Sequence, residues 1–253
     1  MARDPSLLDA ALARSPAALM LSFADPAPFA DRVRAAGVRL ICQVHTLAHA
    51  RRALEVGAAA VQGTEAGGHG LTARGTAAFV PAVADLIARE RPETLLLAAG
   101  GIADGRGLAA ALALGADGVL MGTRFWATRE ALIHPAAKQR VLAATGDETI
   151  RTQVYDIARQ RAWPAPYTGR LLRNAFIETW HGREDALRAA SAERRRDVEE
   201  ADAAGDYDVA NVTVGEAVGL IDDLPGAGDL VLRIAEEAEA AIRRISGMAT
   251  AAP

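Results

Sequence analysis

The chain has 253 residues, which is enough for one large domain or two small ones with a sizeable core. Its formal net charge of -4 argues against a general nucleic-acid binder and against a protein that binds anionic membranes. A single cysteine, Cys42, excludes an internal disulfide and fits a reducing compartment. No export leader and no apolar run of about 18 residues is found, so we expect a cytoplasmic protein.

The first half of the chain alternates short apolar runs with segments of helical spacing. In chain order, we expect helices over 5–14, 28–36, 47–56, 79–89 and 107–114, and strands over 17–23, 38–44, 58–62, 94–99 and 117–121. Gly37, Gly57 and Gly115 stand where three of these helices should end. This alternation predicts about five βα units and a parallel sheet.

The second half has a different character. We expect helices over 129–150 with a break at His134-Pro135, an irregular stretch over 151–184, a charged helix over 183–204, helices over 214–221 and 229–245, and a loose tail over 247–253. The run Arg194-Arg195-Arg196 is interpreted as a solvated face of the charged helix. The chain is therefore predicted to divide into a strand-rich domain, 1–128, and a helical region, 129–253.

A glycine-rich segment follows the strand that ends at Gln62. It reads Gln62-Gly-Thr-Glu-Ala-Gly-Gly-His-Gly70, with little side-chain bulk in sequence around His69. A histidine can act as an acid, a base or a hydrogen-bond donor near neutral pH. A lone histidine is more often structural, but its place after a strand end favours a catalytic role. Glu65 could orient His69 or cap the following turn, and Gln62 could bind a polar ring or satisfy loop backbone.

A second glycine-rich turn, Ala98-Ala-Gly-Gly-Ile-Ala-Asp-Gly105, connects a predicted strand to a predicted helix. Backbone N–H groups at such a helix start favour an anion such as a phosphate, although Asp104 could cap the helix instead. Gly122-Thr123 follows the next strand, and in barrels two consecutive strand ends often share one phosphate. No histidine pair has metal-ligand spacing supported by carboxylates, so no metal site is expected.

Three motifs together resemble the nitronate monooxygenase family: Gln62 to His69, Ala98 to Gly107, and Gly115 to Phe125. The resemblance implies a TIM barrel with a helical substrate domain, bound FMN, and oxidation of alkyl nitronates by O2 to a carbonyl compound and nitrite. It makes His69 the base or the hydrogen-bond donor to the nitro group. It assigns FMN contacts to Gln62, Gly67, Gly100, Gly101, Leu120, Met121, Gly122 and Thr123, with the glycines and Thr123 at the phosphate.

The resemblance is incomplete in two places. The family's barrel has eight strands, whereas this chain shows about five and begins near what would be the fourth. The strand ending at Gln62 is also one or two residues shorter than its echo before Gly122, and each missing residue would shift the His69 loop by about 3.3 Å.

Two alternatives follow from these points. A flavin-dependent enoyl-[acyl-carrier-protein] reductase has similar Ala-Gly-Gly-His and Ala-Gly-Gly-Ile motifs. The chain could also be a catalytically silent remnant, or a half-barrel that needs a partner chain such as a second copy of itself.

Overall fold

The computed structural model describes residues 6–250, without the side chains of 58–61 and 249–250. These residues form an α/β fold of two compact units that interleave along the sequence. Unit one comprises Met1–Gly63, Ala73–Ala99 and Ala111–Leu120, and unit two comprises Thr64–Thr72, Gly100–Ala110 and Met121–Pro253. The domain boundary near residue 128 stays a prediction.

Unit one contains the predicted parallel sheet, with five strands in the order β1-β2-β3-β5-β6. The strands are β1 (Ala18–Leu21), β2 (Arg39–Val44), β3 (Ala58–Gln62), β5 (Leu96–Ala99) and β6 (Gly118–Leu120). All four neighbouring pairs are parallel, as the strand–helix alternation predicted. Cys42 lies buried in β2, and burial raises the pKa of its thiol to about 11.

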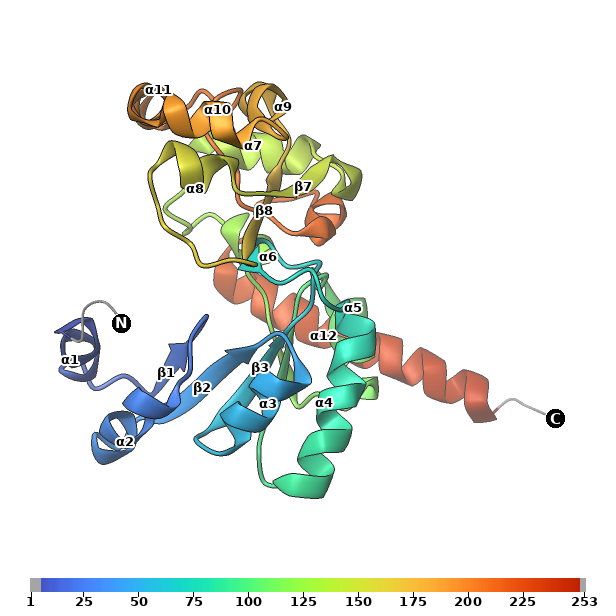
Figure 1. The fold of residues 1–253 in the computed structure, drawn as a ribbon. Coiled ribbons are helices and arrows are strands. Elements are labelled where there is room, and N and C mark those ends of the chain that lie inside the picture. Colours follow the sequence, from blue (N-terminus) through green and yellow to red (C-terminus); the bar gives the residue numbers. More distant parts are fainter. Residues whose placement is uncertain (1–5, 251–253) are drawn as a thin grey trace. The chain divides into compact units, whose positions relative to one another are not determined.

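The helices of unit one follow the predicted pattern, with ends shifted by a few residues. They are α1 (Ser6–Leu12), α2 (Ala27–Ala35), α3 (Leu47–Leu54) and α4 (Thr76–Glu90), with α5 (Gly105–Ala113) running from unit two into unit one. α2, α3 and α4 pack against the sheet (Figure 1). Phe79, Val83 and Leu86 point from α4 into this core and are almost fully buried. Gly37 has φ of +70°, which lets the chain turn after α2.

Unit two contains a three-stranded antiparallel sheet in the order β4-β8-β7. Its strands are β4 (Gly68–Gly70), β7 (Thr149–Thr152) and β8 (Thr168–Leu172). Its helices are α6 (Thr123–Trp126), α7 (Pro135–Ala143), α8 (Val154–Ala158), α9 (Ala175–Trp180), α10 (Glu184–Ala189), α11 (Ser191–Ala204) and α12 (Ala227–Thr250), with 3-10 turns η1 (Gly146–Glu148) and η2 (Glu216–Leu220).

Several expectations for the second half are wrong. Residues 151–184 are not irregular, because β7 pairs with β8, α8 lies between these strands and α9 follows β8. The helix expected over 129–150 is confined to α7, where the side chain of His134 accepts the Ala136 N–H at the start. The charged helix is interrupted at Ala190, and the helix over 214–221 is a 3-10 turn.

The end of the chain also differs from the expectation. α12 continues through residues 247–250, where a loose tail was expected, and the remaining tail residues lie outside the described part. No helix within residues 6–250 is both long enough and apolar enough to cross a membrane.

Candidate functional site

His69 lies in unit two, in the short strand β4 rather than in an open loop. β4 pairs with β8, and His69 stands opposite Gly169. Its side chain is 22% exposed, so the imidazole is held by the protein and still reaches solvent. Glycine neighbours in the sequence suggested open surroundings, but the strand pairing brings other segments onto the ring.

Asp156 is the carboxylate that the fold places on His69. The distance from His69 Nε2 to Asp156 Oδ2 is 2.8 Å, and the Asp156 side chain is only 12% exposed. Asp156 lies in α8, 87 residues away along the chain. A carboxylate at this distance favours the tautomer with a proton on Nε2, which makes Nδ1 the nitrogen that can accept a proton. Glu65 is one possible orienting residue by its place in the sequence, whereas the carboxylate at 2.8 Å from Nε2 in the structure is that of Asp156.

Trp163 covers one face of the imidazole. The ring centroids of His69 and Trp163 are 3.6 Å apart and the ring planes differ by 9°, which is a stacked arrangement. Trp163 comes from the loop between α8 and β8. The stack and the Asp156 contact together restrict the rotation of the imidazole, so the ring is presented to a ligand in one orientation.

The segment before His69 is fixed by two arginines of the small sheet, of which Arg170 is buried and Arg151 is half-buried. Arg151 Nη2 donates to the Thr64 carbonyl at 2.9 Å, and Arg170 Nη2 donates to the same oxygen at 3.1 Å. Arg170 also pairs with Glu216 at 2.7 Å. Burial, together with the charge of Arg170, lowers the pKa of Arg151 to about 10. Arg151 therefore remains charged at neutral pH, and both arginines hold the carbonyl end of this loop.

Gly67 packs directly against the backbone of another segment. A Cβ built on Gly67 would lie 2.6 Å from the Val214 carbonyl carbon, and one built on Gly215 would lie 2.5 Å from the Glu65 carbonyl oxygen. Both positions therefore require glycine for close approach. A Cβ on Gly101 would lie 3.5 Å from the Glu65 Cβ, and the Gly215 N–H donates to Thr123 Oγ1 at 2.9 Å. Gly67, Gly101 and Thr123, which come from three predicted motifs, thus meet around Glu65 and Gly215.

The start of α5 does not have the free amides expected of a phosphate site. The Gly105 N–H donates to Glu237 Oε2 at 2.9 Å, and Asp104 Oδ1 accepts the amides of Arg106 and Gly107 at 2.9 and 3.1 Å. Burial opposes ionisation of Asp104, but hydrogen bonds from Arg106 and Gly107 hold its pKa below the usual value. The capping alternative for Asp104 is confirmed, and an anion at the first amides of α5 is excluded by these carboxylates.

The other glycines of these turns have either a left-handed backbone or open space beside them. Gly100 and Gly101 have φ of 104° and 73°, a backbone that side chains disfavour. A Cβ on Gly122 would meet nothing within 4 Å. Thr123 Oγ1 accepts one amide, which leaves its hydroxyl proton available for donation.

Gln62 and Leu120 lie in unit one, at the carboxyl ends of β3 and β6. Gln62 pairs with Ala99 in the register of the sheet, and Ala99 pairs with Leu120. The two Gly-Thr motifs alone would match Gln62 with Met121. In the register of the sheet Gln62 is level with Leu120 instead, so Gly63-Thr64 follows its strand one residue earlier than Gly122-Thr123 does. Gln62 is buried, and Leu120 is 36% exposed.

Asp156, Trp163, Arg151 and Arg170 were not recognised in the sequence. They come from the stretch that was expected to be irregular, and no local pattern marks them. One signal was available: residues 151–184 contain two of the three tryptophans and two of the three tyrosines. Within the described residues, no group of three or more histidine, cysteine, aspartate or glutamate side chains is arranged to hold a metal ion.

Comparison with known proteins identifies a family for this chain. A family model described as nitronate monooxygenase matches residues 6–237. A nitronate monooxygenase of Neurospora crassa is 38% identical over 228 residues, which cover 87% of this chain and 59% of that protein. The chain thus spans about three fifths of the length of this relative.

Two solved structures share the fold. FabK from Thermotoga maritima superposes with a TM-score of 0.83 at 27% identity, covering 97% of this chain and 76% of that one. Nitroalkane oxidase from Streptomyces ansochromogenes superposes with a TM-score of 0.73 at 27% identity, covering 94% of this chain and 70% of that one.

Proposed function

The chain belongs to the nitronate monooxygenase family, a family of oxidoreductases, and on this premise we propose that it oxidises alkyl nitronates. The proposed reaction consumes O2 and yields a carbonyl compound and nitrite, with FMN as the cofactor. The observation that carries the proposal is His69, held by Asp156 at 2.8 Å and stacked on Trp163 at 3.6 Å.

His69 is proposed to act on the nitro end of the substrate. With the Nε2 proton directed at Asp156, Nδ1 can take the α-proton of a nitroalkane, and the charge that forms on the ring is stabilised by the Asp156 carboxylate. A substrate that is already a nitronate needs no proton removal, and a protonated His69 would then bind the anion. Trp163 limits access of water to one face of the ring.

FMN would supply the redox chemistry, accepting electrons from the nitronate and passing them to O2. The residues proposed to hold it are Gln62, Gly67, Gly100, Gly101, Leu120, Met121, Gly122 and Thr123. The backbone at Gly100 and Gly101, the space beside Gly122 and the Thr123 hydroxyl fit a phosphate group. The first amides of α5 do not fit one, because Glu237 and Asp104 occupy them.

The parallel sheet of unit one is proposed to be part of a TIM-type barrel. The five parallel strands follow one another in sequential order, as in such barrels. Each strand is followed by a helix or by a loop with predicted ligand contacts. Residues 129–253 would then be the helical substrate region.

The proposal is tested with the full chain reconstituted with FMN and supplied with an alkyl nitronate. We expect O2 consumption, nitrite release and no requirement for a reduced nicotinamide. The variant His69→Ala should lower turnover by about 10²-fold or more, while flavin absorbance is retained. His49→Ala, in unit one, is the matched control and should keep wild-type turnover. Protein that takes up FMN but leaves nitronate unreacted would refute the proposed activity.

The likeness to FabK supports a second candidate, a flavin-dependent enoyl-[acyl-carrier-protein] reductase. That reaction needs a reduced nicotinamide as the electron source. Oxidation of NADH or NADPH that depends on an enoyl thioester, without nitrite formation, would favour this alternative. Protein that binds no FMN would favour the third reading, a catalytically silent chain or one that needs a partner.

A further inference from the structure

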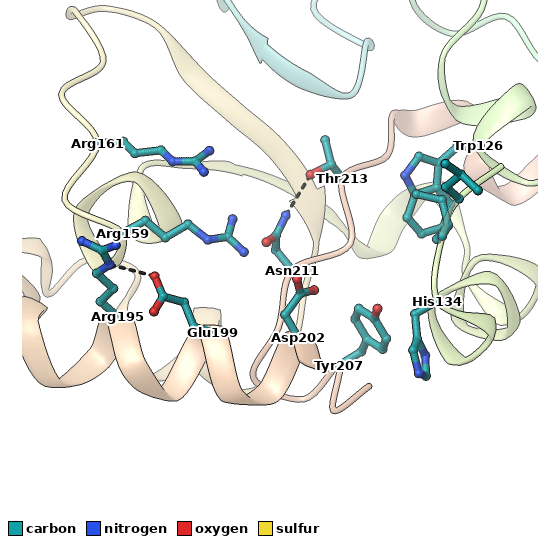
Figure 2. Close-up of a pocket in the computed structure, with 12 residues that line it drawn as sticks. Trp126, His134, Arg159, Arg161, Arg195, Glu199, Asp202, Tyr207, Asn211 and Thr213 are labelled. Carbon is teal, nitrogen blue, oxygen red and sulfur yellow. Dashed lines mark hydrogen bonds and ion pairs between the residues drawn. The ribbon is translucent and has the colours of Figure 1, made fainter. Parts of the chain in front are cut away.

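Unit two contains a cavity of about 560 Å³ whose lining is divided by chemistry. Figure 2 shows arginine side chains at one end and aromatic side chains at the other. The volume lies within the usual range for small-molecule pockets. Neither end is used by the proposed nitronate reaction, so the cavity needs an explanation of its own.

Two arginines form the cationic end. Arg159 follows α8 directly, Arg161 lies two residues further, and both guanidinium groups extend in the same direction, towards Asn211 and Thr213 (Figure 2). Within the described residues, neither guanidinium has a hydrogen bond or an ion pair. The Arg159 guanidinium carbon stands 5.5 Å from the centroid of the Tyr155 ring. Each guanidinium therefore offers five N–H donors, and both groups point to the same part of the cavity. Neither has an acceptor among the described residues.

Placing these two arginines side by side has an energetic cost. Burial, followed by the charge of Arg161, lowers the pKa of Arg159. A bound anion would offset both the burial of Arg159 and its repulsion from Arg161. It would supply the hydrogen bonds that water no longer makes, and its negative charge would balance the two positive charges.

Other charged groups around the cavity leave this end positive. Glu199 is engaged by Arg195, with 2.8 Å between Nε and Oε1. Asp202 also lines the cavity and its charge acts on both Arg159 and Tyr207. Among the described residues that line the cavity there are thus three arginines and two carboxylates, and of the two carboxylates Asp202 is the one without an arginine partner.

The hydroxyl of Thr213 adds a third donor. Asn211 Nδ2 donates to Thr213 Oγ1 at 2.9 Å, so the hydroxyl proton of Thr213 is directed elsewhere (Figure 2). Two guanidinium groups and a hydroxyl match the three terminal oxygens of a phosphate group, whereas a carboxylate is satisfied by one bidentate guanidinium.

The opposite end is aromatic. Trp126, Tyr207 and His134 line it (Figure 2). Flat apolar side chains of this kind stack on planar ring systems. We propose that the cavity binds a molecule with a phosphate group at one end and a planar ring at the other, which is the chemistry of a nucleoside monophosphate. The binding site stands on its own residues and does not depend on the nitronate activity.

Calorimetric titration of the full chain tests this inference, with AMP as the probe and adenosine and inorganic phosphate as comparators. AMP should bind, and it should bind at least about tenfold more tightly than either comparator, because each comparator engages only one end. The double variant Arg159→Gln/Arg161→Gln should weaken AMP binding at least about tenfold, equivalent to 1.4 kcal/mol, and leave the weak adenosine binding unchanged. Raised salt should weaken AMP binding to the wild type more than to the variant.

Arg196→Gln is the matched control, because Arg196 is exposed on α11 and does not line the cavity. The single variant Arg161→Gln carries the test if the double variant does not fold, since the Arg161 side chain makes no hydrogen bond within the described residues. Equal AMP affinity in wild type and Arg161→Gln would overturn the proposal, as would absence of AMP binding to the wild type. Inorganic phosphate that binds as tightly as AMP would overturn the role of the aromatic end.

Discussion

At the scale of single residues, the pairing of His69 with Asp156 is the contact with the greatest expected effect on chemistry. Replacing Asp156 by Asn keeps the size of the side chain but allows the amide N–H2 to face Nε2, which favours the opposite imidazole tautomer. We expect Asp156→Asn to lower kcat by about 10²-fold with little change in FMN content. Steady-state kinetics with nitronate, alongside the flavin spectrum, measure both quantities.

The control for this variant is Asp185→Asn, whose carboxylate is exposed on α10 and pairs only with Arg188 among the described residues. A kcat for Asp156→Asn within twofold of the wild-type value would remove Asp156 from its positioning role. Loss of FMN in parallel with kcat would instead assign Asp156 a structural role.

Gly67 provides a second test at this scale, on stability. A methyl group there would press on the Val214 and Gly215 backbone at 2.6 to 2.7 Å, and backbone atoms cannot rotate away. Overpacking of this kind costs about 1–3 kcal/mol, so Gly67→Ala should lower the melting temperature by several degrees. Gly228→Ala in α12, where a Cβ meets nothing within 4 Å, should be neutral or slightly stabilising. A wild-type melting temperature for Gly67→Ala would show that residues 214–215 are free to move.

At the scale of secondary-structure elements, Asp223 links α12 to α6 through ion pairs with one arginine of each helix. The Asp223 carboxylate accepts Arg233 Nη1 from α12 at 2.7 Å and also pairs with buried Arg124 from α6. The hydrogen bond from Arg233, with the charge and hydrogen bond of Arg124, lowers the pKa of Asp223. A carboxyl group with a lowered folded-state pKa stabilises the fold above its unfolded pKa, about 3.9, and loses this contribution as pH falls through the folded value.

The pH dependence of unfolding tests this link. Asp223→Asn should melt below the wild type at pH 7, and the two melting curves should converge below pH of about 3. Asp229→Asn, whose partner Arg129 is exposed, should show no such pH-dependent difference. A constant gap between wild type and Asp223→Asn at all pH values would attribute the effect to packing instead of charge.

Local sequence patterns explain which helices, strands and contacts could be predicted. The helices and strands of unit one follow from local patterns, because a buried parallel strand and an amphipathic helix each leave a regular trace, and Gly37 and Gly115 mark helix ends with φ of 70° and 98°. The meeting of Gly67, Gly101 and Thr123 was foreseeable, since they follow the carboxyl ends of neighbouring parallel strands. β4, Asp156 and Trp163 were not, because a three-residue strand of Gly-His-Gly exists only through its pairing with β8.

At the scale of the whole molecule, the two sheets predict an order of amide exchange. β2, β3 and β5 each have neighbours on both sides, whereas β1 and β6 each pair with one strand in the described sheet. We expect amides of Arg39–Val44 and Leu96–Ala99 to exchange more slowly than those of Ala18–Leu21, since edge strands open first. In unit two, β8 should exchange more slowly than β4.

Hydrogen–deuterium exchange with peptide-level mass spectrometry measures this order at several protein concentrations. Slow exchange of β1 that persists at every concentration would contradict the prediction. Protection of β1 that grows with concentration would show that another copy of the chain pairs with this edge.

The interleaving of the two units has a consequence for any attempt to divide the chain. The segments Thr64–Thr72 and Gly100–Ala110 belong to unit two but arise as excursions from the strands of unit one. A fragment beginning at residue 129 would leave behind His69, both glycine turns and the β4 partner of β8. The complementary fragment would keep His69 but lose Asp156 and Trp163. Neither fragment would contain all the residues of the His69 site. After recombination or gene fission within residues 64–172, the site could form only if the two fragments reassociated.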